Sequence, residues 1–135
     1  MRGKVTWVRD VMFVGEAGSG NAVVMEGGRS NNGVRPMEMI LLGVGGCAAY
    51  DVVSILQKAR QNIISCHCEL DGARPDTSPS PFERIDMEFV VRGRGLKESH
   101  VARAVRLSAE KYCSASIMLR NAGVEIVHRY RVEEA

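Results

Sequence analysis

Residues 36–60, PMEMILLGVGGCAAYDVVSILQKAR, carry the strongest structural signal in this chain of 135 residues. Pro36 suits the first position of a helix, and Glu38 complements the partial positive charge of a helix N-terminus. Residues 39–50 are apolar around the whole helix, which is typical of burial, whereas from Asp51 onward apolar and polar positions separate onto two faces. We predict one helix over residues 36–60 with a buried first half.

Short strands precede this helix. Residues 4–26 contain two or three apolar or alternating stretches, separated by Arg9-Asp10 and by the glycine-rich residues 18–21, both of which suit tight turns. Residues 27–33 are polar and form a loop. The pattern predicts a small antiparallel sheet before the helix.

Strands also follow the helix. Residues 64–70 and 84–92 alternate apolar with polar side chains, the period of a half-buried strand. The stretch between them, residues 72–83, contains three prolines and is predicted to be a loop. An amphipathic helix is predicted over residues 97–112.

A short helix near residues 115–121 and a last strand over residues 124–132 complete the chain. The resulting order is βββ-α-ββ-αα-β, which places the protein in the α+β class. The length and the lack of a linker or repeat predict a single domain over residues 1–135.

Composition excludes several partners. The 18 basic and 16 acidic residues leave a net charge of +2, so neither nucleic acid nor an acidic membrane surface is indicated. The start of the chain lacks a signal-peptide pattern, and the longest uncharged run, residues 39–50, is shorter than the ~20 residues of a membrane span. We expect a cytoplasmic protein without a membrane partner, in which the four cysteines are thiols.

A glycine motif offers one alternative function. Gly43-Val44-Gly45-Gly46-Cys47-Ala48 satisfies the G-x-G-x-x-A fingerprint of dinucleotide-binding loops, and Glu69 or Asp71 could bind a ribose. Against this, Pro36 and Glu38 suit the start of a helix better than a central strand. The other interpretation is that the glycines allow a buried helix to pack closely against a neighbour.

Four cysteines raise the question of metal or redox chemistry. Cys66 and Cys68 flank His67 in a predicted strand, and with His100 or His128 they could bind zinc. Because no second ligand pair has metal-site spacing, we interpret both as small core residues and expect neither a metal ion nor a cofactor. Cys47 and Cys113 lie 66 residues apart, and from composition alone they could equally be buried packing residues.

A resemblance gives these two cysteines a role. Pro36-Met37-Glu38-Met39, Gly43-x-Gly45-Gly46-Cys47 and Asp51-Val52-Val53, with Glu110-Lys111-Tyr112-Cys113-Ser114 downstream, resemble the OsmC/Ohr family and within it the YhfA-like branch. The resemblance implies an intertwined homodimer with long central helices packed against antiparallel sheets. It also implies a thiol peroxidase for hydrophobic organic hydroperoxides, with Cys47 as the peroxidatic cysteine, Cys113 as the resolving cysteine and an external dithiol as reductant.

A peroxidatic cysteine must react as a thiolate, and Cys47 lies about 16 Å along the helix from Pro36, too far for the helix N-terminus to help. The family's peroxidases pair an arginine with a glutamate directly after the helix-opening proline. Here that position is Met37, with Glu38 one residue later. The activating cation could be Arg9, Arg29 or Arg35.

We therefore expect a homodimeric thiol peroxidase that acts in defence against oxidative stress. The first alternative is a catalytically weak relative that binds a small apolar ligand in the dimer cleft. The second is a dinucleotide-binding module that uses Gly43 and Gly45.

Overall fold

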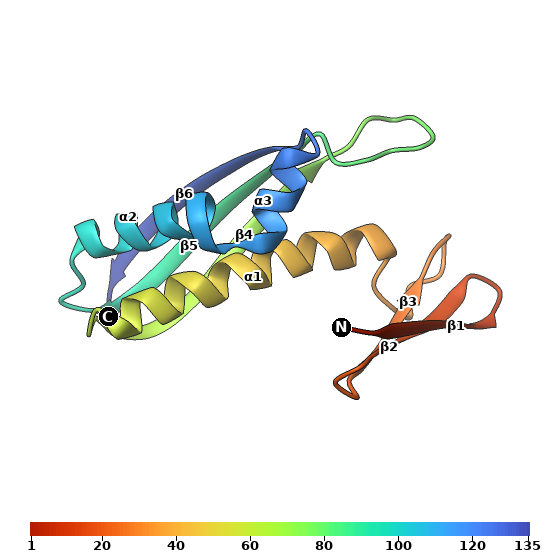
Figure 1. Ribbon diagram of the computed structural model, residues 1–135, viewed down its shortest axis with the longest axis horizontal. Helices are drawn as coiled ribbons and strands as arrows, with labels where there is room; N and C mark the ends of the chain where they lie inside the picture. The colour runs from red at the N-terminus through yellow and green to blue at the C-terminus, as the bar shows by residue number, and fades with distance from the viewer. The chain divides into compact units, whose positions relative to one another are not determined.

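The computed structural model describes residues 1–135 (Figure 1). The elements follow the predicted order, and the chain divides within its long helix into two compact units, Met1–Ile40 and Leu41–Ala135. The mixed α+β class is confirmed. The elements are β1 (Gly3–Arg9), β2 (Met12–Ala17), β3 (Ala22–Glu26), α1 (Pro36–Lys58), β4 (Asn62–Ala73), β5 (Arg84–Arg94), α2 (Glu98–Leu107), a π-helical turn η1 (Ser108–Tyr112), α3 (Ser114–Asn121) and β6 (Glu125–Glu134).

The first unit is an antiparallel sheet in the order β1-β2-β3. Asp10 turns the chain between β1 and β2 with a φ of 42°, a left-handed conformation that aspartate tolerates better than most residues. The indole Nε1 of Trp7 donates a 2.9 Å hydrogen bond to the Asp10 carbonyl oxygen and braces this turn. The predicted turn at Arg9-Asp10 is confirmed.

The second unit contains a sheet in the order β4-β5-β6, with β5 in the centre. One face of β5 is fully buried through Ile85, Met87, Phe89 and Val91, and it forms the core together with Val44, Ala48, Val52 and Leu56 of α1. The opposite face carries ion pairs, among them Arg84 to Asp86 at 2.8 Å. This sheet is therefore covered by the helices on one side and polar on the other.

One strand pairing differs from the expectation of antiparallel sheets. β4 and β5 are antiparallel, but β5 and β6 are parallel. Since β6 runs in the same direction as β5, the chain must return to the end of the sheet where β5 begins before it enters β6. A tight hairpin cannot make this connection, so a longer crossover is required. The segment from α2 to α3 supplies that crossover.

The predicted long helix is confirmed as α1, but its buried first half is corrected. Only one stripe of α1 is buried, and on the other side Ile40, Leu42 and Tyr50 are 45%, 53% and 75% exposed. A single chain has too few elements to cover both sides of this helix. By length and composition α1 could also cross a membrane, with a mean hydropathy of 1.9 over 18 residues, a test that core helices of soluble proteins also pass.

The predicted helix over residues 97–112 is interrupted. α2 ends at Leu107, and the backbone then widens into η1, where the Cys113 N–H donates to the Ser108 carbonyl oxygen at 2.9 Å. Cys113 itself is extended, with φ −74° and ψ 96°, before α3 begins. Such π turns interrupt helices frequently at functional sites.

Candidate thiol site

Cys47 lies in the middle of α1, on the side of the helix that packs against the core. Its side chain is half-buried. Gly45, two residues earlier, is buried against Leu70 of β4, and a Cβ at this position would collide with the Leu70 methyl group. The interpretation of the glycines as close-packing residues is confirmed for Gly45, but not for Gly43 and Gly46, where an added Cβ would meet nothing within 4 Å in this chain.

Cys113 lies at the junction between η1 and α3 and is completely buried. Its Sγ accepts a hydrogen bond from the Ser116 backbone N–H at 3.4 Å, so the thiol caps the N-terminus of α3. The Ser116 hydroxyl donates in turn to the Cys113 carbonyl oxygen at 3.3 Å. The two hydrogen bonds with Ser116 hold Cys113 in place at the start of α3.

The fold brings the two thiols together. Burial raises the pKa of the Cys113 thiol, the hydrogen bonds with Ser116 oppose this rise, and the neighbouring Cys47 thiol adds to it. Cys113 is therefore protonated at neutral pH. Neither cysteine forms a disulfide, and the two lie on segments far apart in the sequence.

A hydrogen bond fixes η1 against α1 beside this pair. The buried Ser108 hydroxyl donates to Asp51 Oδ2 at 3.1 Å and lies 3.4 Å from the Ala48 carbonyl oxygen. Asp51 and Ala48 follow Cys47 within about one helical turn. Sequence patterns identified Asp51 only as part of a family motif and did not indicate its bond to Ser108.

The charged residues considered as activators lie in the first unit. Glu38 Oε1 accepts a 2.7 Å hydrogen bond from the Arg35 backbone N–H, as in a capping box, and the Arg35 guanidinium donates to the Gly28 carbonyl oxygen at 2.5 Å. Arg9 and Arg29 are exposed and make no ion pair. Glu38 is thus engaged at the start of α1.

Cys66 and Cys68 pack against the core from β4, which confirms their interpretation as core residues. His67 points to the opposite face of the strand and lies 3.3 Å from Glu69. Burial raises the pKa of Cys66, and burial followed by the charges of Cys66 and Glu69 raises the pKa of Cys68 to about 12. No group of three or more metal-binding side chains gathers in the structure.

The dinucleotide-binding alternative is wrong. Residues 43–48 lie inside α1, which starts at Pro36, so no strand precedes the glycines and no phosphate-binding loop exists. The fingerprint has a physical meaning only between a strand and a helix N-terminus, where backbone N–H groups are free.

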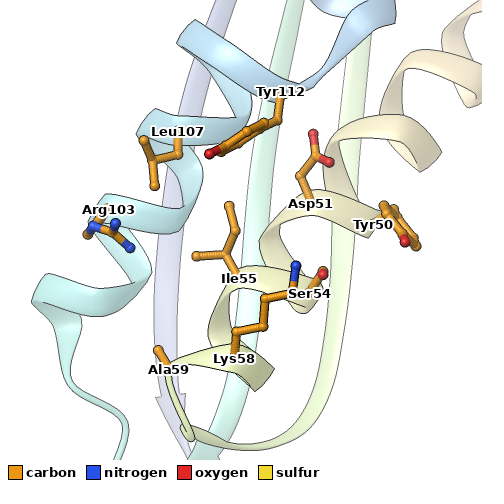
Figure 2. A pocket seen from close by; sticks show the side chains of 9 residues that line it. All are labelled: Tyr50, Asp51, Ser54, Ile55, Lys58, Ala59, Arg103, Leu107 and Tyr112. Carbon is orange, nitrogen blue, oxygen red and sulfur yellow. The ribbon is translucent and has the colours of Figure 1, made fainter.

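A pocket that sequence reasoning missed lies between α1 and the segment from α2 to η1 (Figure 2). Its volume is about 470 Å³. The wall carries both apolar and charged side chains, which belong to Tyr50, Asp51, Ser54, Ile55, Lys58, Ala59, Arg103, Leu107 and Tyr112. Helical spacing alone could have placed the residues of each helix on one face, but not the two faces opposite each other.

The fold defines a class of protein. The chain belongs to the OsmC-like protein family, whose model matches residues 28–129. It is 47% identical to Protein YhfA of Escherichia coli strain K12 over 135 residues, which cover 100% of both chains.

Solved structures agree with this membership. A hypothetical protein from Aquifex aeolicus VF5 has a TM-score of 0.88 at 26% identity, covering 99% of this chain and 96% of that chain. The organic hydroperoxide resistance protein OhrB of Bacillus subtilis has a TM-score of 0.65 at 16% identity, covering 97% of this chain and 98% of that chain. The likeness to OhrB concerns the fold alone.

Proposed function

We propose that this protein is a thiol-dependent peroxidase that reduces organic hydroperoxides, with Cys47 as the peroxidatic and Cys113 as the resolving cysteine. The observation that supports the proposal is that the Cys47 thiol lies close enough to Cys113 to raise its pKa, although the two come from α1 and from the junction of η1 and α3. The proposal requires the Cα atoms of Cys47 and Cys113 to come within about 7 Å of each other when the disulfide forms.

The chemistry balances in three steps. The Cys47 thiolate attacks the hydroxyl oxygen of the hydroperoxide, the O–O bond breaks, Cys47 becomes a sulfenic acid, and the departing alkoxide takes a proton from water to leave as the alcohol. The Cys113 sulfur then attacks the Cys47 sulfur, which forms a disulfide and releases water. An external dithiol reduces the disulfide by exchange and restores both thiols.

The difference between the two thiols supports this division of roles. Cys113 is fully buried and its raised pKa keeps it protonated, whereas Cys47 is only half-buried and is the thiol that a substrate can reach. A buried thiol makes a poor first nucleophile but can resolve a sulfenic acid formed beside it. The family includes hydroperoxide resistance proteins, and the fold matches OhrB.

The working form we propose is a cytoplasmic homodimer. Large apolar side chains are exposed on α1 and throughout the first sheet, and exposed apolar patches often mark interaction surfaces. A second copy is the partner that would cover them, with residues 1–135 acting as one domain of the intertwined dimer. The exposed side chains are Val5, Trp7, Val8, Val11, Phe13, Val24, Ile40, Leu42 and Tyr50.

The activating cation belongs to the same proposal. Cys47 needs a positive charge to react as a thiolate, and arginine keeps its charge when it loses water. Arg9, Arg29 and Arg35 are the candidates, and Glu38 could orient one of them. Replacing each arginine by methionine should reveal the activator as the one variant whose thiol oxidation slows at unchanged stability.

The engagement of Glu38 with the Arg35 backbone favours a second candidate function. If no arginine is held beside Cys47, the protein is a catalytically weak relative that binds a small apolar ligand in the dimer cleft. In that case the Cys47 thiol reacts with peroxides no faster than a free cysteine.

One experiment separates the two candidates. The reduced protein is mixed with tert-butyl hydroperoxide or hydrogen peroxide, and thiol loss is followed over time. A peroxidase should consume the organic peroxide faster than hydrogen peroxide and far faster than free cysteine, and Cys47→Ser should abolish this reaction. Rates equal to free cysteine with both peroxides would refute the peroxidase and leave the ligand-binding function.

A further inference from the structure

One wall of the pocket in Figure 2 is formed by α1 and the other by the segment from α2 to η1. Lys58 reaches into it from α1 and Arg103 lies on the wall formed by α2, with Ile55 between them (Figure 2). The volume of about 470 Å³ lies in the range of small-molecule sites, roughly 300–1,000 Å³. The pocket is distinct from the thiol pair, since neither Cys47 nor Cys113 lines it.

The wall of the pocket carries more positive than negative side chains. Neither Lys58 nor Arg103 forms an ion pair or a side-chain hydrogen bond within the chain. Asp51 is the single acidic residue of the wall, and it already accepts a hydrogen bond from Ser108. The pocket therefore offers two unpaired cations to a ligand.

The rest of the wall is suited to an apolar group. Ile55 and Leu107 approach each other from the two helices, and the ring of Tyr112 lies beside them (Figure 2). An alkyl chain or an aromatic ring on this surface would be removed from water, while a second negative charge would face Asp51. The complementary ligand has one anionic group and one apolar part.

We propose that this pocket is a binding site for monocarboxylates that carry an apolar chain or ring, with Lys58 and Arg103 as the anion-binding residues. The site does not depend on the proposed peroxidase activity, because its ligand is recognised by charge and apolar surface and not by a reacting bond. Binding can therefore be measured on the reduced protein or on Cys47→Ser without any peroxide.

The test compares three probes with the same chain and different heads: octanoate, octan-1-ol and octylammonium. Calorimetric titration of the full-length protein should show octanoate binding about tenfold or more tighter than octan-1-ol, as expected for a charge-assisted hydrogen bond. Octylammonium should bind more weakly than octan-1-ol. Equal affinities for octanoate and octan-1-ol would overturn the proposal.

Substitutions of Lys58 and Arg103 then test whether these residues bind the carboxylate. Lys58→Met and Arg103→Met keep the aliphatic stems, and each should weaken octanoate binding several-fold while octan-1-ol binding stays unchanged. Arg106→Met is the matched control, because Arg106 lies on the same helix but outside the pocket. Asp51→Asn keeps an acceptor for Ser108 and should tighten octanoate binding. A folded Lys58→Met/Arg103→Met double variant that binds octanoate like the wild type would contradict the assignment.

Discussion

The Ser108 hydroxyl donates a 3.1 Å hydrogen bond to Oδ2 of Asp51, although 57 residues separate the two along the chain. Ser108 opens the π turn that ends beside Cys113, and Asp51 follows Cys47 by one helical turn. This bond joins the two segments that carry the thiol pair. Ser108 is therefore a positioning residue in the proposed reaction.

Ser108→Ala should affect the oxidation of Cys47 and the formation of the disulfide differently. We expect the free energy of unfolding to fall by about 1 kcal/mol, because one buried hydrogen bond is lost. The first oxidation of Cys47 should keep its rate, whereas disulfide formation should slow because η1 is no longer fixed against α1. Stopped-flow oxidation with tert-butyl hydroperoxide, combined with sulfenic acid trapping, measures both rates.

Ser54→Ala is the matched control, since Ser54 lies on α1 and makes no side-chain hydrogen bond. It should leave both rates unchanged. If Ser108→Ala lowers stability but not the rate of disulfide formation, its role is structural only.

If Cys47 attacks the peroxide and Cys113 resolves the sulfenic acid, serine variants of the two cysteines should lose different steps of the reaction. Cys47→Ser should consume no peroxide and form no sulfenic acid. Cys113→Ser should react with one equivalent, give a sulfenic acid at Cys47 that can be trapped, and pass to the irreversible sulfinic acid in excess peroxide. Mass spectrometry distinguishes these products from the Cys47–Cys113 disulfide expected of the wild type. Loss of the first oxidation in Cys113→Ser would refute the assignment.

The order of elements could be predicted from local patterns because each element has its own period. Two such elements are confirmed: the helix that starts at Pro36, and the alternating strand around Cys66 and Cys68. The break of the second helix could not be predicted. The break starts at Ser108, whose bond to Asp51 is a contact between residues distant in the chain that helical periodicity cannot indicate.

The candidate site of Cys47 and Cys113 could be predicted from the sequence only through the resemblance to a known family. Cys47 and Cys113 lie on separate elements, so no local spacing indicates that their thiols meet. The pocket between α1 and α2 was missed for the same reason, because Lys58 and Arg103 belong to different helices. The exposure of Leu42 and Tyr50 contradicted the predicted burial, since burial of an apolar helix can require a second chain.

Cys66→Ala and Cys68→Ala should leave peroxide turnover unchanged. Both thiols have raised pKa values, so they remain protonated at neutral pH and are poor nucleophiles. Each replacement should lower the free energy of unfolding by about 1 kcal/mol through lost packing. Turnover with a dithiol reductant and urea unfolding measure the two effects. A folded variant without turnover would contradict the assignment of Cys47 and Cys113.

Leu42→Glu should convert the proposed dimer into monomers. Leu42 lies on the exposed side of α1 and is 53% exposed, so a carboxylate there is solvated in the single chain but would lose its water under a second copy. Sedimentation at micromolar concentration measures the change.

Ile64→Glu provides the comparison for Leu42→Glu. Ile64 of β4 is 49% exposed but lies outside α1 and the first sheet, so this variant should sediment like the wild type. A wild-type protein that is a stable folded monomer would contradict the proposed dimer.

His128 should make the protein less stable below neutral pH. Its ring stacks on Phe89 with centroids 6.5 Å apart, and its buried Nε2 has no hydrogen-bond partner. Burial, followed by the charge of Arg120, lowers the pKa of His128 below its ordinary value. The folded state therefore binds fewer protons than the unfolded chain, and stability falls as the pH drops below the unfolded pKa of about 6.5.

His128→Phe removes this titration and keeps an aromatic ring against Phe89. Urea unfolding at about pH 7.5 and about pH 5 should show a smaller loss of stability for His128→Phe than for the wild type, because only the wild type must keep an imidazole neutral in the core. The carboxylate of Asp86, whose pKa is lowered first by its hydrogen bond with Arg84, loses its contribution only below about pH 4 and does not enter this window. An equal loss in His128→Phe and the wild type would mean that another group senses the acid.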